Sequence, residues 1–459
     1  MSSRRTWVVL PDQLSSRLFV DTGIVAGLRA KLGDRLVLVP VGDGIGRPLG
    51  GDGVPVLDAA TLAPHDAPAT ARLHRGLDRR LDRVLGYYPL AIRLNLRHGF
   101  HRERMHPGHE NWMLDSARVG PLPRWAPVER LMTSWHFGRG RYVPRSLREA
   151  MGRDCAALVL SNVQPKVVVP FLVGARRLRI PIVAHVASWD HTVGKGVIAP
   201  FCDAYIVQNA TMQDDLIRYH GIPADRIVVT GWPQTDVYSR KRPREDFDAL
   251  LRSHGLDPAL PLVVVMGNTP TNAPYEASFV DRVVRWWQSE GRGRMSLLFR
   301  PHPRDRDWRE RFATALAAPD VHVQEASFTD LDVLATVLQH AHCVVANAGT
   351  ILLEAIVNDR PAVCVLYDEG APEGESWALQ NVGGEHYREL ATSDAFYRAD
   401  RFEEVVAGIE RALAEPGELA PERRRVVAEV VGDVDGHAAE RVVAAICAVA
   451  ENAVAGSGA

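Results

Sequence analysis

One histidine and two arginines alternate with two prolines in the segment Arg300-Pro301-His302-Pro303-Arg304. The prolines restrict the backbone and reduce the entropy that the imidazole loses when it meets a ligand. His302, with Arg300 or Arg304 beside it, is therefore predicted to form a preorganised donor set for phosphate oxygens. The alternative is a rigid proline turn whose cations only face solvent.

A second candidate anion site is the run Asn347-Ala348-Gly349-Thr350, where small residues join a predicted strand to a predicted helix. Backbone N–H groups and the positive end of the helix dipole would then face the strand end. Glu354 follows about one turn into the helix, where its carboxylate suits ribose hydroxyls. Alternatively, Gly349 serves only close packing and Glu354 faces water.

A carboxylate, an imidazole and an indole occur together in Ser188-Trp189-Asp190-His191, and Lys195 follows between two glycines. Asp190 or His191 is a candidate general base, because either can take a proton from a hydroxyl if its surroundings adjust its pKa. Ser188, Trp189 and Lys195 are predicted on the acceptor side. The alternative is that Asp190 caps a helix and Trp189 belongs to the core.

Shorter loops follow two other predicted strands. Asn268 and Thr269 come directly after one of them, and Asp12 follows the first strand of the chain. Each is a candidate ligand contact and equally a turn residue. The chain has no GxxxxGK[ST] phosphate loop, no HExxH and no GxSxG elbow, and its Asp-x-Asp pairs are as frequent as chance predicts, so no metal site is expected.

Apolar runs and amphipathic stretches alternate along the whole chain, which is typical of βα repeats that build parallel sheets. The predicted strands are 7–10, 35–40, 157–161, 166–170, 182–186, 204–208, 226–231, 262–266, 296–300, 321–324, 343–347 and 362–366, and helices are predicted to begin near Glu276, Asp307, Asp330 and Thr350. The fold class predicted is α/β, with two doubly wound, Rossmann-like domains facing each other across a cleft. Ligands are expected at the carboxyl ends of the strands.

The length of 459 residues favours two or three domains. The polar segment 238–261 contains three prolines and a helical middle, and is the predicted linker. We therefore expect an N-terminal, acceptor-side domain at 1–240, with an insertion around 71–145, and a donor-binding domain at 241–459. The last helix, 437–452, is expected to pack back on the N-terminal domain.

Composition excludes several classes of protein. With 46 % hydrophobic and 24 % charged residues and a formal charge of −2, the chain is neither disordered nor a general nucleic-acid binder. Five scattered cysteines without a CxxC pair predict packed thiols in a reducing compartment. Because there is neither a signal-peptide core nor a run of about 20 apolar residues, a cytoplasmic location is expected.

The segment 71–106 is locally basic, with nine arginines and four histidines against three acidic residues. One interpretation is a solvated helix face. The other is a surface that binds an anionic acceptor or a lipid headgroup. The second reading predicts peripheral contact with an anionic membrane, at its inner face.

Taken together, these motifs resemble the GT-B superfamily. The resemblance rests on the two doubly wound halves, a Gly-x-Pro-x-x-Asp loop at 231–236, the His-Pro loop, the Gly-Thr helix start with its glutamate, and the closing DGHAAERV. The superfamily includes nucleotide-sugar glycosyltransferases, UDP-N-acetylglucosamine 2-epimerases and CDP-glycerol glycerophosphotransferases. From about residue 155 to 450 the chain looks most like surface-polysaccharide transferases of the CDP-glycerol glycerophosphotransferase-like kind.

This resemblance implies an enzyme that transfers a sugar, or a polyol phosphate, from a nucleotide-activated donor to a hydroxyl acceptor without a cofactor. The acceptor is expected to be a glycan or a small molecule, in cell-envelope polysaccharide synthesis. It implies donor contacts for His302 (phosphates), Gly349 and Thr350 (phosphates, through N–H groups), Glu354 (ribose), and Asn268 and Thr269 (nucleotide pocket).

The chain departs from both relatives at particular motifs. The paired acids in the first domain of the epimerases have no matching motif here, so a sugar-nucleotide 2-epimerase is the second hypothesis. Asn347-Ala348-Gly349-Thr350 stands where glycerophosphate polymerases carry Asp-Tyr-Ser-Ser, which leaves a sugar nucleotide open as the donor. A third hypothesis is a catalytically silent nucleotide-sugar-binding module.

Overall fold

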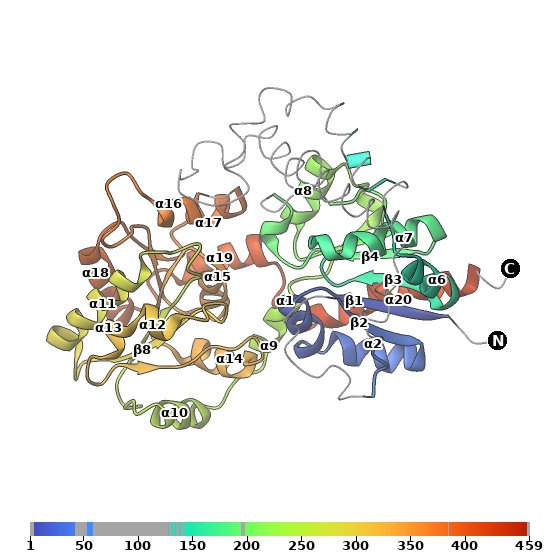
Figure 1. Ribbon diagram of the computed structural model, residues 1–459. Helices are drawn as coiled ribbons and strands as arrows, with labels where there is room; N and C mark the ends of the chain where they lie inside the picture. Colours follow the sequence, from blue (N-terminus) through green and yellow to red (C-terminus); the bar gives the residue numbers. More distant parts are fainter. Residues whose placement is uncertain are drawn as a thin grey trace. The chain divides into compact units, whose positions relative to one another are not determined.

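The computed structural model describes residues 4–41, 53–57, 142–193, 198–383 and 385–456, with a few positions between 127 and 138. The described chain forms two compact units (Figure 1). Unit 1 runs to Asp236 and resumes at His437, and unit 2 is Val237–Gly436. The basic segment 71–106 and Lys195 lie outside the described residues.

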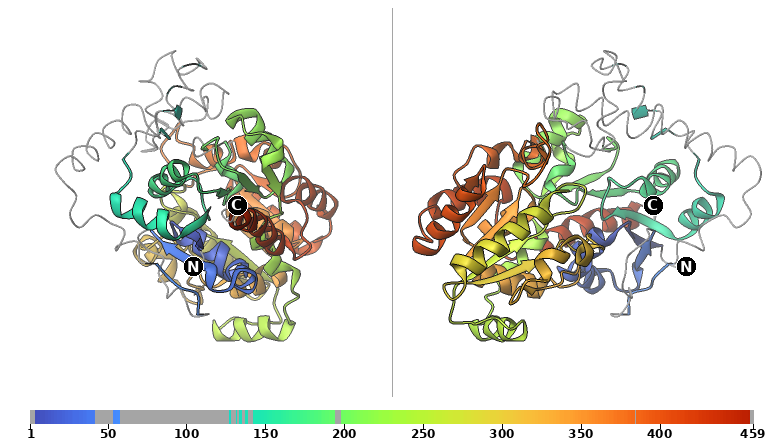
Figure 2. Two further views of the ribbon diagram at one scale, coloured as in Figure 1. Left: turned by 90° about the vertical axis from the view of Figure 1, so that its right-hand side faces the viewer. Right: turned by 60° about the vertical axis from the view of Figure 1, so that its left-hand side comes forward.

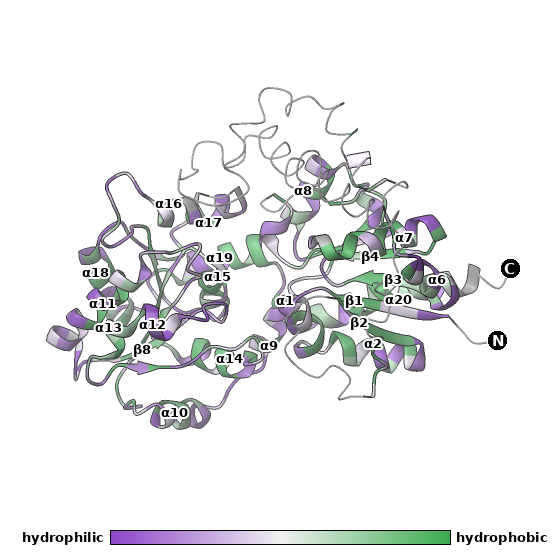
Figure 3. Ribbon diagram, viewed as in Figure 1, coloured by the Kyte–Doolittle hydropathy of each residue, from purple (hydrophilic) through white to green (hydrophobic). Residues whose placement is uncertain are grey.

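Unit 1 contains a parallel sheet with the strand order β2-β1-β3-β4-β5-β6. Its central strands are buried and apolar on both faces, as expected for a parallel sheet (Figure 3). The strands are β1 (Arg5–Leu10), β2 (Leu36–Pro40), β3 (Cys155–Leu160), β4 (Ile182–His185), β5 (Ala204–Val207) and β6 (Ile227–Val229). The helices are α1 (Gln13–Ser16), α2 (Ile24–Leu32), α6 (Arg145–Asp154), α7 (Val169–Leu178), α8 (Ala210–His220) and α20 (Ala438–Gly456), and α9 (Asp236–Ser239) follows at the boundary.

The last helix, α20, lies beside α2 and packs against β3 (Figures 1 and 2). Its start is held by Asp236, whose carboxylate accepts the N–H groups of Ala438 at 3.1 Å and Ala439 at 2.7 Å. A carboxylate is favourable at this positive end of a helix. Arg441 also donates to the carbonyl oxygen of Thr230, at 2.7 Å. The Gly-x-Pro-x-x-Asp loop and the closing segment of the chain therefore meet in unit 1.

Unit 2 contains a second parallel sheet, with the strand order β12-β11-β10-β7-β8-β9. The strands are β7 (Leu262–Met266), β8 (Ser296–Arg300), β9 (His322–Val323), β10 (Cys343–Asn347), β11 (Ala362–Val365) and β12 (Tyr397–Ala399). The helices are α10 (Arg244–Ser253), α11 (Glu276–Trp286), α12 (Trp308–Arg311), α13 (Ala313–Leu316), α14 (Leu331–His340), α15 (Thr350–Val357), α16 (Trp377–Val382), α17 (Arg388–Ala391), α18 (Phe402–Ala414) and α19 (Ala420–Val426).

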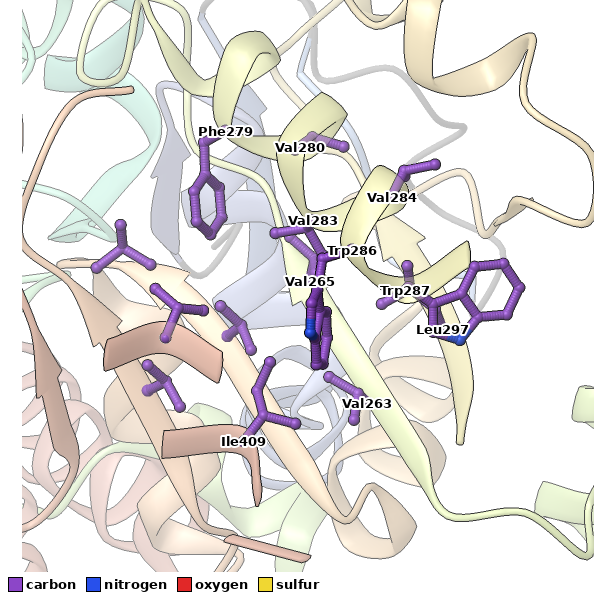
Figure 4. Close-up of a cluster of buried hydrophobic side chains, with 14 of the residues drawn as sticks. Val263, Val265, Phe279, Val280, Val283, Val284, Trp286, Trp287, Leu297 and Ile409 are labelled. Atoms are coloured by element: carbon purple, nitrogen blue, oxygen red, sulfur yellow. The ribbon is translucent and has the colours of Figure 1, made fainter. Parts of the chain in front are cut away.

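Helix α11 covers one face of the unit 2 sheet. Its apolar side chains recur with the helical period at Phe279, Val283 and Trp286, and they pack in one buried cluster with Val263 of β7 and Ile409 of α18 (Figure 4). This packing fixes the position at which α11 begins, at Glu276.

The predicted fold class, α/β with two Rossmann-like doubly wound domains, is confirmed, but one predicted strand is wrong. Residues Lys166–Val168 form a 3₁₀ turn and α7 begins at Val169, with Pro170 in its first turn. Parallel neighbours such as β3 and β4 need a crossover helix between them, and proline suits the first turn of a helix. The short edge strand β12 was not predicted.

All five cysteines are free and buried, which confirms the prediction of packed thiols. Burial raises the pKa of the thiols of Cys202, Cys343 and Cys364 to about 12. In the part of the chain that the structure describes, no helix is both long and apolar enough to cross a bilayer.

Candidate active site

The carboxyl ends of the central strands carry the candidate residues in both units. In unit 2 the strand order runs outward from β7 in one direction and from β10 in the other, so the order reverses between these two neighbours. In unit 1 the reversal lies between β1 and β3. Ligands of open α/β sheets bind beside such a reversal.

Three loops meet at this edge of unit 2, after β7, β8 and β10. A Cβ atom placed on Gly349 would lie 4.0 Å from Nδ2 of Asn268. A Cβ on Gly267 would lie 3.1 Å from the backbone nitrogen of His302 and 3.1 Å from Cα of Pro301. The structure therefore brings the predicted residues Asn268, His302 and Gly349 to one edge of the sheet.

Helix α15 begins at this edge with an extended glycine and no side-chain cap. The N–H groups at a helix start lack partners within the helix and coincide with the positive end of its dipole. Gly349 leaves space in front of them, and its carbonyl oxygen accepts the hydroxyl of Tyr387 at 2.6 Å. Gly349 and Thr350 thus form a backbone site suited to an anion.

The imidazole of His302 has a defined tautomer. The backbone N–H of Arg304 donates to its Nδ1 at 3.0 Å. Nδ1 therefore carries a lone pair, the ring is neutral, and the proton sits on Nε2, which is a hydrogen-bond donor. The exposed Arg304 guanidinium lies 5.7 Å from the centre of the Phe328 ring. The loop thus combines a neutral donor and a cation.

Two other predicted donor contacts are engaged within unit 2. Arg300 is 5 % exposed and donates to Gln324 at 2.5 Å and to Asp330 at 2.7 Å. The amide of Asn347 donates to a carbonyl oxygen of β11 at 2.9 Å and accepts from Asn381 at 2.6 Å. Their direct contact with a donor stays a prediction.

The remaining donor-side candidates are held in defined orientations. Glu354 is 4 % exposed, and its carboxylate accepts the hydroxyl of Tyr238. The N–H of Thr269 donates to Oδ1 of Asn268 at 2.8 Å, so the Asn268 NH₂ group faces away from this bond and toward Gly349. Sequence reasoning missed Tyr238, because nothing in its local pattern indicates a partner in another helix.

At the unit 1 edge, Asp12 bridges the reversal between β1 and β3. Its carboxylate accepts the N–H and the hydroxyl of Ser15, both at 2.7 Å, and the amide of Asn162 at 3.1 Å. Asp12 therefore caps α1 and is fixed to the loop after β3. Asn162 was not among the predicted site residues.

Ser188, Trp189, Asp190 and His191 follow β4 at the same edge, the last three in a 3₁₀ turn. Nε2 of His191 lies 3.9 Å from Oδ1 of Asp190, and the imidazole is largely buried. Trp189 is buried as well. Gln164 donates to the carbonyl oxygen of His191 at 3.2 Å. The predicted acid and imidazole therefore lie together.

The loop that carries His191 is anchored to α8. The hydroxyl of Thr192 donates to Asp215 at 2.7 Å. His220 bonds through Nε2 to the carbonyl oxygen of Thr192 at 2.7 Å and accepts the N–H of Ile198 at Nδ1, at 3.1 Å. These bonds hold both ends of the loop. Among the described residues no three His, Cys, Asp or Glu side chains are grouped to hold a metal ion.

His185, at the end of β4, predicts a pH dependence of stability. It is fully buried, its Nδ1 bonds to the carbonyl oxygen of Ser161 at 2.9 Å, and burial lowers its pKa to about 4. Because the folded pKa lies below the unfolded value near 6.5, its contribution is present above pH 6.5 and is lost as the pH falls toward 4. We expect the free energy of unfolding to fall by roughly 3 kcal/mol over this range.

Urea unfolding between pH 7 and 4 measures this effect, with the His185→Gln variant as the comparison. The variant should be less stable at pH 7 but show a flatter pH dependence. If the free energy of unfolding depends on pH equally steeply in both proteins, groups other than His185 cause the pH dependence.

The comparisons with known proteins support the fold. No protein-family model and no curated protein match the sequence. A UDP-GlcNAc 2-epimerase from Neisseria meningitidis, solved with UDP-GlcNAc, is 9 % identical, with a TM-score of 0.56 over 97 % of this chain and 100 % of the epimerase. A glycosyltransferase from Rickettsia africae is 10 % identical, with a TM-score of 0.52 over 97 % and 99 %. A putative UDP-N-acetylglucosamine 2-epimerase from Listeria monocytogenes is 12 % identical, with a TM-score of 0.52 over 97 % and 96 %.

At these identities the likeness concerns the fold alone. The likeness extends along nearly the whole chain and therefore includes both of its parallel sheets. The resemblance predicted from the motifs is confirmed at this level: the chain has a GT-B-type fold.

Proposed function

We propose that this chain transfers a sugar, or a polyol phosphate, from a nucleotide-activated donor to a hydroxyl acceptor. The observation that carries the proposal is the meeting of three loops, each with a phosphate-compatible group, at the strand-order reversal of unit 2. These groups are the uncapped start of α15 at Gly349, the Nε2–H of His302 and the NH₂ group of Asn268. Such donors suit a diphosphate.

In the proposed reaction the acceptor oxygen loses its proton to a base and bonds to the reactive carbon of the donor. The bond from that carbon to the diphosphate breaks, and the diphosphate leaves with the electron pair. His302, Arg304 and the start of α15 stabilise the charge that develops on it. For a polyol phosphate donor, the acceptor oxygen would instead attack the phosphorus that carries the polyol. The bond from that phosphorus to the bridging oxygen would break, and the nucleoside monophosphate would leave with the electron pair.

We assign the base to the pair of Asp190 and His191 at the unit 1 edge. The imidazole takes the proton, and the carboxylate at 3.9 Å favours the resulting imidazolium. Asp12 and Ser188 belong to the same edge, and we propose that they orient the acceptor. Glu354, held by Tyr238, would accept from ribose hydroxyls.

A thermal-shift panel of CMP, CDP, UDP, GDP and dTDP tests the proposal. A ligand that binds only the folded state stabilises it by about 2.7 kcal/mol at 100 times its Kd, which raises Tm by several degrees. We expect at least one diphosphate to do so. CMP is the matched control for CDP, because it lacks the second phosphate. No shift with any nucleotide would contradict the proposed function.

A sugar-nucleotide 2-epimerase is the second candidate, because two of the similar folds above belong to such enzymes or putative ones. Incubation with UDP-GlcNAc separates the candidates. An epimerised nucleotide sugar without an added acceptor would favour the epimerase, whereas acceptor-dependent release of UDP would favour transfer. Nucleotide binding with neither reaction would favour the silent binding module.

We also propose that the acceptor is an envelope polysaccharide and that the segment 71–106 touches the inner face of an anionic membrane. The charge of this segment supports membrane contact. Sedimentation with phosphatidylserine-containing vesicles over a salt series tests it, and we expect co-sedimentation that weakens with salt. Failure to co-sediment at low salt would contradict it.

A further inference from the structure

Three ionisable side chains lie together in unit 2 and link the loops that carry Asn268 and His302. They are Glu276 at the start of α11, Arg311 at the end of α12, and Asp305 in the loop after β8. None of them was a predicted site residue. Their exposed side-chain fractions are only 7 %, 14 % and 1 %.

Glu276 holds the loop after β7 by its backbone. Its two carboxylate oxygens lie 2.8 Å and 3.0 Å from the N–H of Asn268, which donates to both. A backbone bond of this kind fixes the residue that follows the strand, independently of its side chain. On this fixed backbone, the bond from the Thr269 N–H to Oδ1 of Asn268 turns the Asn268 NH₂ group toward Gly349.

Arg311 joins this carboxylate to the next loop through its guanidinium fork. Nη2 donates to Glu276 at 3.3 Å and to the carbonyl oxygen of Ala273 at 2.7 Å, and Nη1 donates to Asp305. Two parallel donors on one rigid plane set the spacing of two acceptors, which a lysine cannot reproduce. Arg311 thus spans the loops after β7 and β8.

Asp305 completes the connection to the backbone of His302. Its N–H donates to the carbonyl oxygen of His302 at 2.8 Å. Gly267 also packs against the backbone of His302, where a Cβ would lie 3.1 Å from the nitrogen. Asn268 and His302 are therefore linked through Glu276, Arg311 and Asp305.

Stability alone is a weak reason for this arrangement. Burying charges costs several kcal/mol per ion, and apolar replacements of buried pairs are often neutral or stabilising. Burial raises the pKa of Glu276 to about 8, against the opposing effects of Arg311 and the Asn268 N–H. What the trio supplies is fixed geometry between two loops at the candidate phosphate site.

We propose that Glu276, Arg311 and Asp305 form a clasp that positions Asn268 and His302 for the donor diphosphate. The three are positioning residues, because they act through the loops and do not touch the donor. This inference rests on the proposed function.

The test compares Arg311→Lys and Glu276→Gln with the parent by calorimetric titration with UDP, CDP, GDP and dTDP at pH 9, where the Glu276 carboxylate is ionised. Each variant removes one link of the clasp and keeps the size of the side chain similar. The parent defines which nucleotide binds. For that nucleotide we expect the Kd of each clasp variant to be about tenfold higher or more, because hydrogen bonds to charged groups are lost. Arg309→Lys is the matched control, since Arg309 lies in the same helix, is exposed and pairs with Glu325.

Two further readouts separate positioning from general destabilisation. Combining Arg311→Lys with His302→Ala should raise the Kd by less than the product of the single effects, because both changes disable the same contact. Hydrogen exchange should quicken at residues 267–273 in Arg311→Lys but not in Arg309→Lys.

A pH series isolates Glu276. Facing its carboxylate are Arg311 from α12 and Asp305 from the loop after β8. Between pH 7 and 9 we expect the nucleotide affinity of the parent to rise more than that of Glu276→Gln, because ionisation of Glu276 strengthens its bonds to Arg311 and Asn268.

The outcomes are distinct. If the parent binds no nucleotide in this titration or in the panel, the proposed function falls, and the clasp with it. If the parent binds and both clasp variants bind as tightly as Arg309→Lys, only the clasp is overturned. If Arg311→Lys does not fold, the near-isosteric Glu276→Gln decides.

Discussion

Replacing His302 with alanine should lower turnover by about 100-fold or more, with little change in the stability of the fold. In the proposed reaction the Nε2–H of His302 donates to a leaving group on which charge develops, and loss of one such donor costs about 10²- to 10³-fold in kcat. Steady-state kinetics with the donor identified by the nucleotide panel measures the effect.

His322→Ala is the matched control, because this half-buried histidine opens the edge strand β9, in register with Leu298 of β8, and its ring lies against Gly255. A second variant defines the role. The tautomer fixed by Arg304 predicts a neutral hydrogen-bond donor, so His302→Gln should recover part of the activity that His302→Ala loses. No recovery would favour proton transfer from His302, and an unchanged rate in His302→Ala would remove this residue from the mechanism.

The parallel sheets were predictable because each central strand is a short, continuous apolar run. One apolar run is not a strand, because the topology of the sheet requires a helix at that place in the chain. Residues 166–170 are rich in valine and read as a strand, yet they lie in the only connection between β3 and β4 and must supply the crossover helix α7. The edge strand β12 has three residues, too few for a pattern.

The parts of the candidate site that follow strands directly were also predictable. Asn268, His302 and Gly349 each come after an apolar run, and the rule that ligands bind at carboxyl ends of strands brings them to one edge. The clasp was not predictable in this way. Glu276 and Arg311 are 35 residues apart, and only the packing of α11 and α12 places them together. Similarly, Arg300 looked like a ligand contact, and its bonds to Gln324 and Asp330 are visible only in three dimensions.

At the unit 1 edge, His191→Asn should lower kcat by about 10²- to 10⁴-fold, the usual contribution of a general base. The Kd for the nucleotide should stay unchanged, because we assign the donor to unit 2 and His191 to the acceptor. Turnover and calorimetric titration of the same preparations measure both quantities. His437→Asn, an exposed histidine of unit 1, is the control.

Asp190→Asn distinguishes the two members of the pair. If His191 takes the proton, its neighbour at 3.9 Å acts only through its charge, and Asp190→Asn should cost much less than His191→Asn. The reverse order would make Asp190 the base and His191 its partner. Loss of nucleotide affinity in His191→Asn would argue against both assignments, because a residue that serves only the acceptor has no means of changing donor binding. The ratio of the two kcat losses therefore identifies the atom that receives the proton.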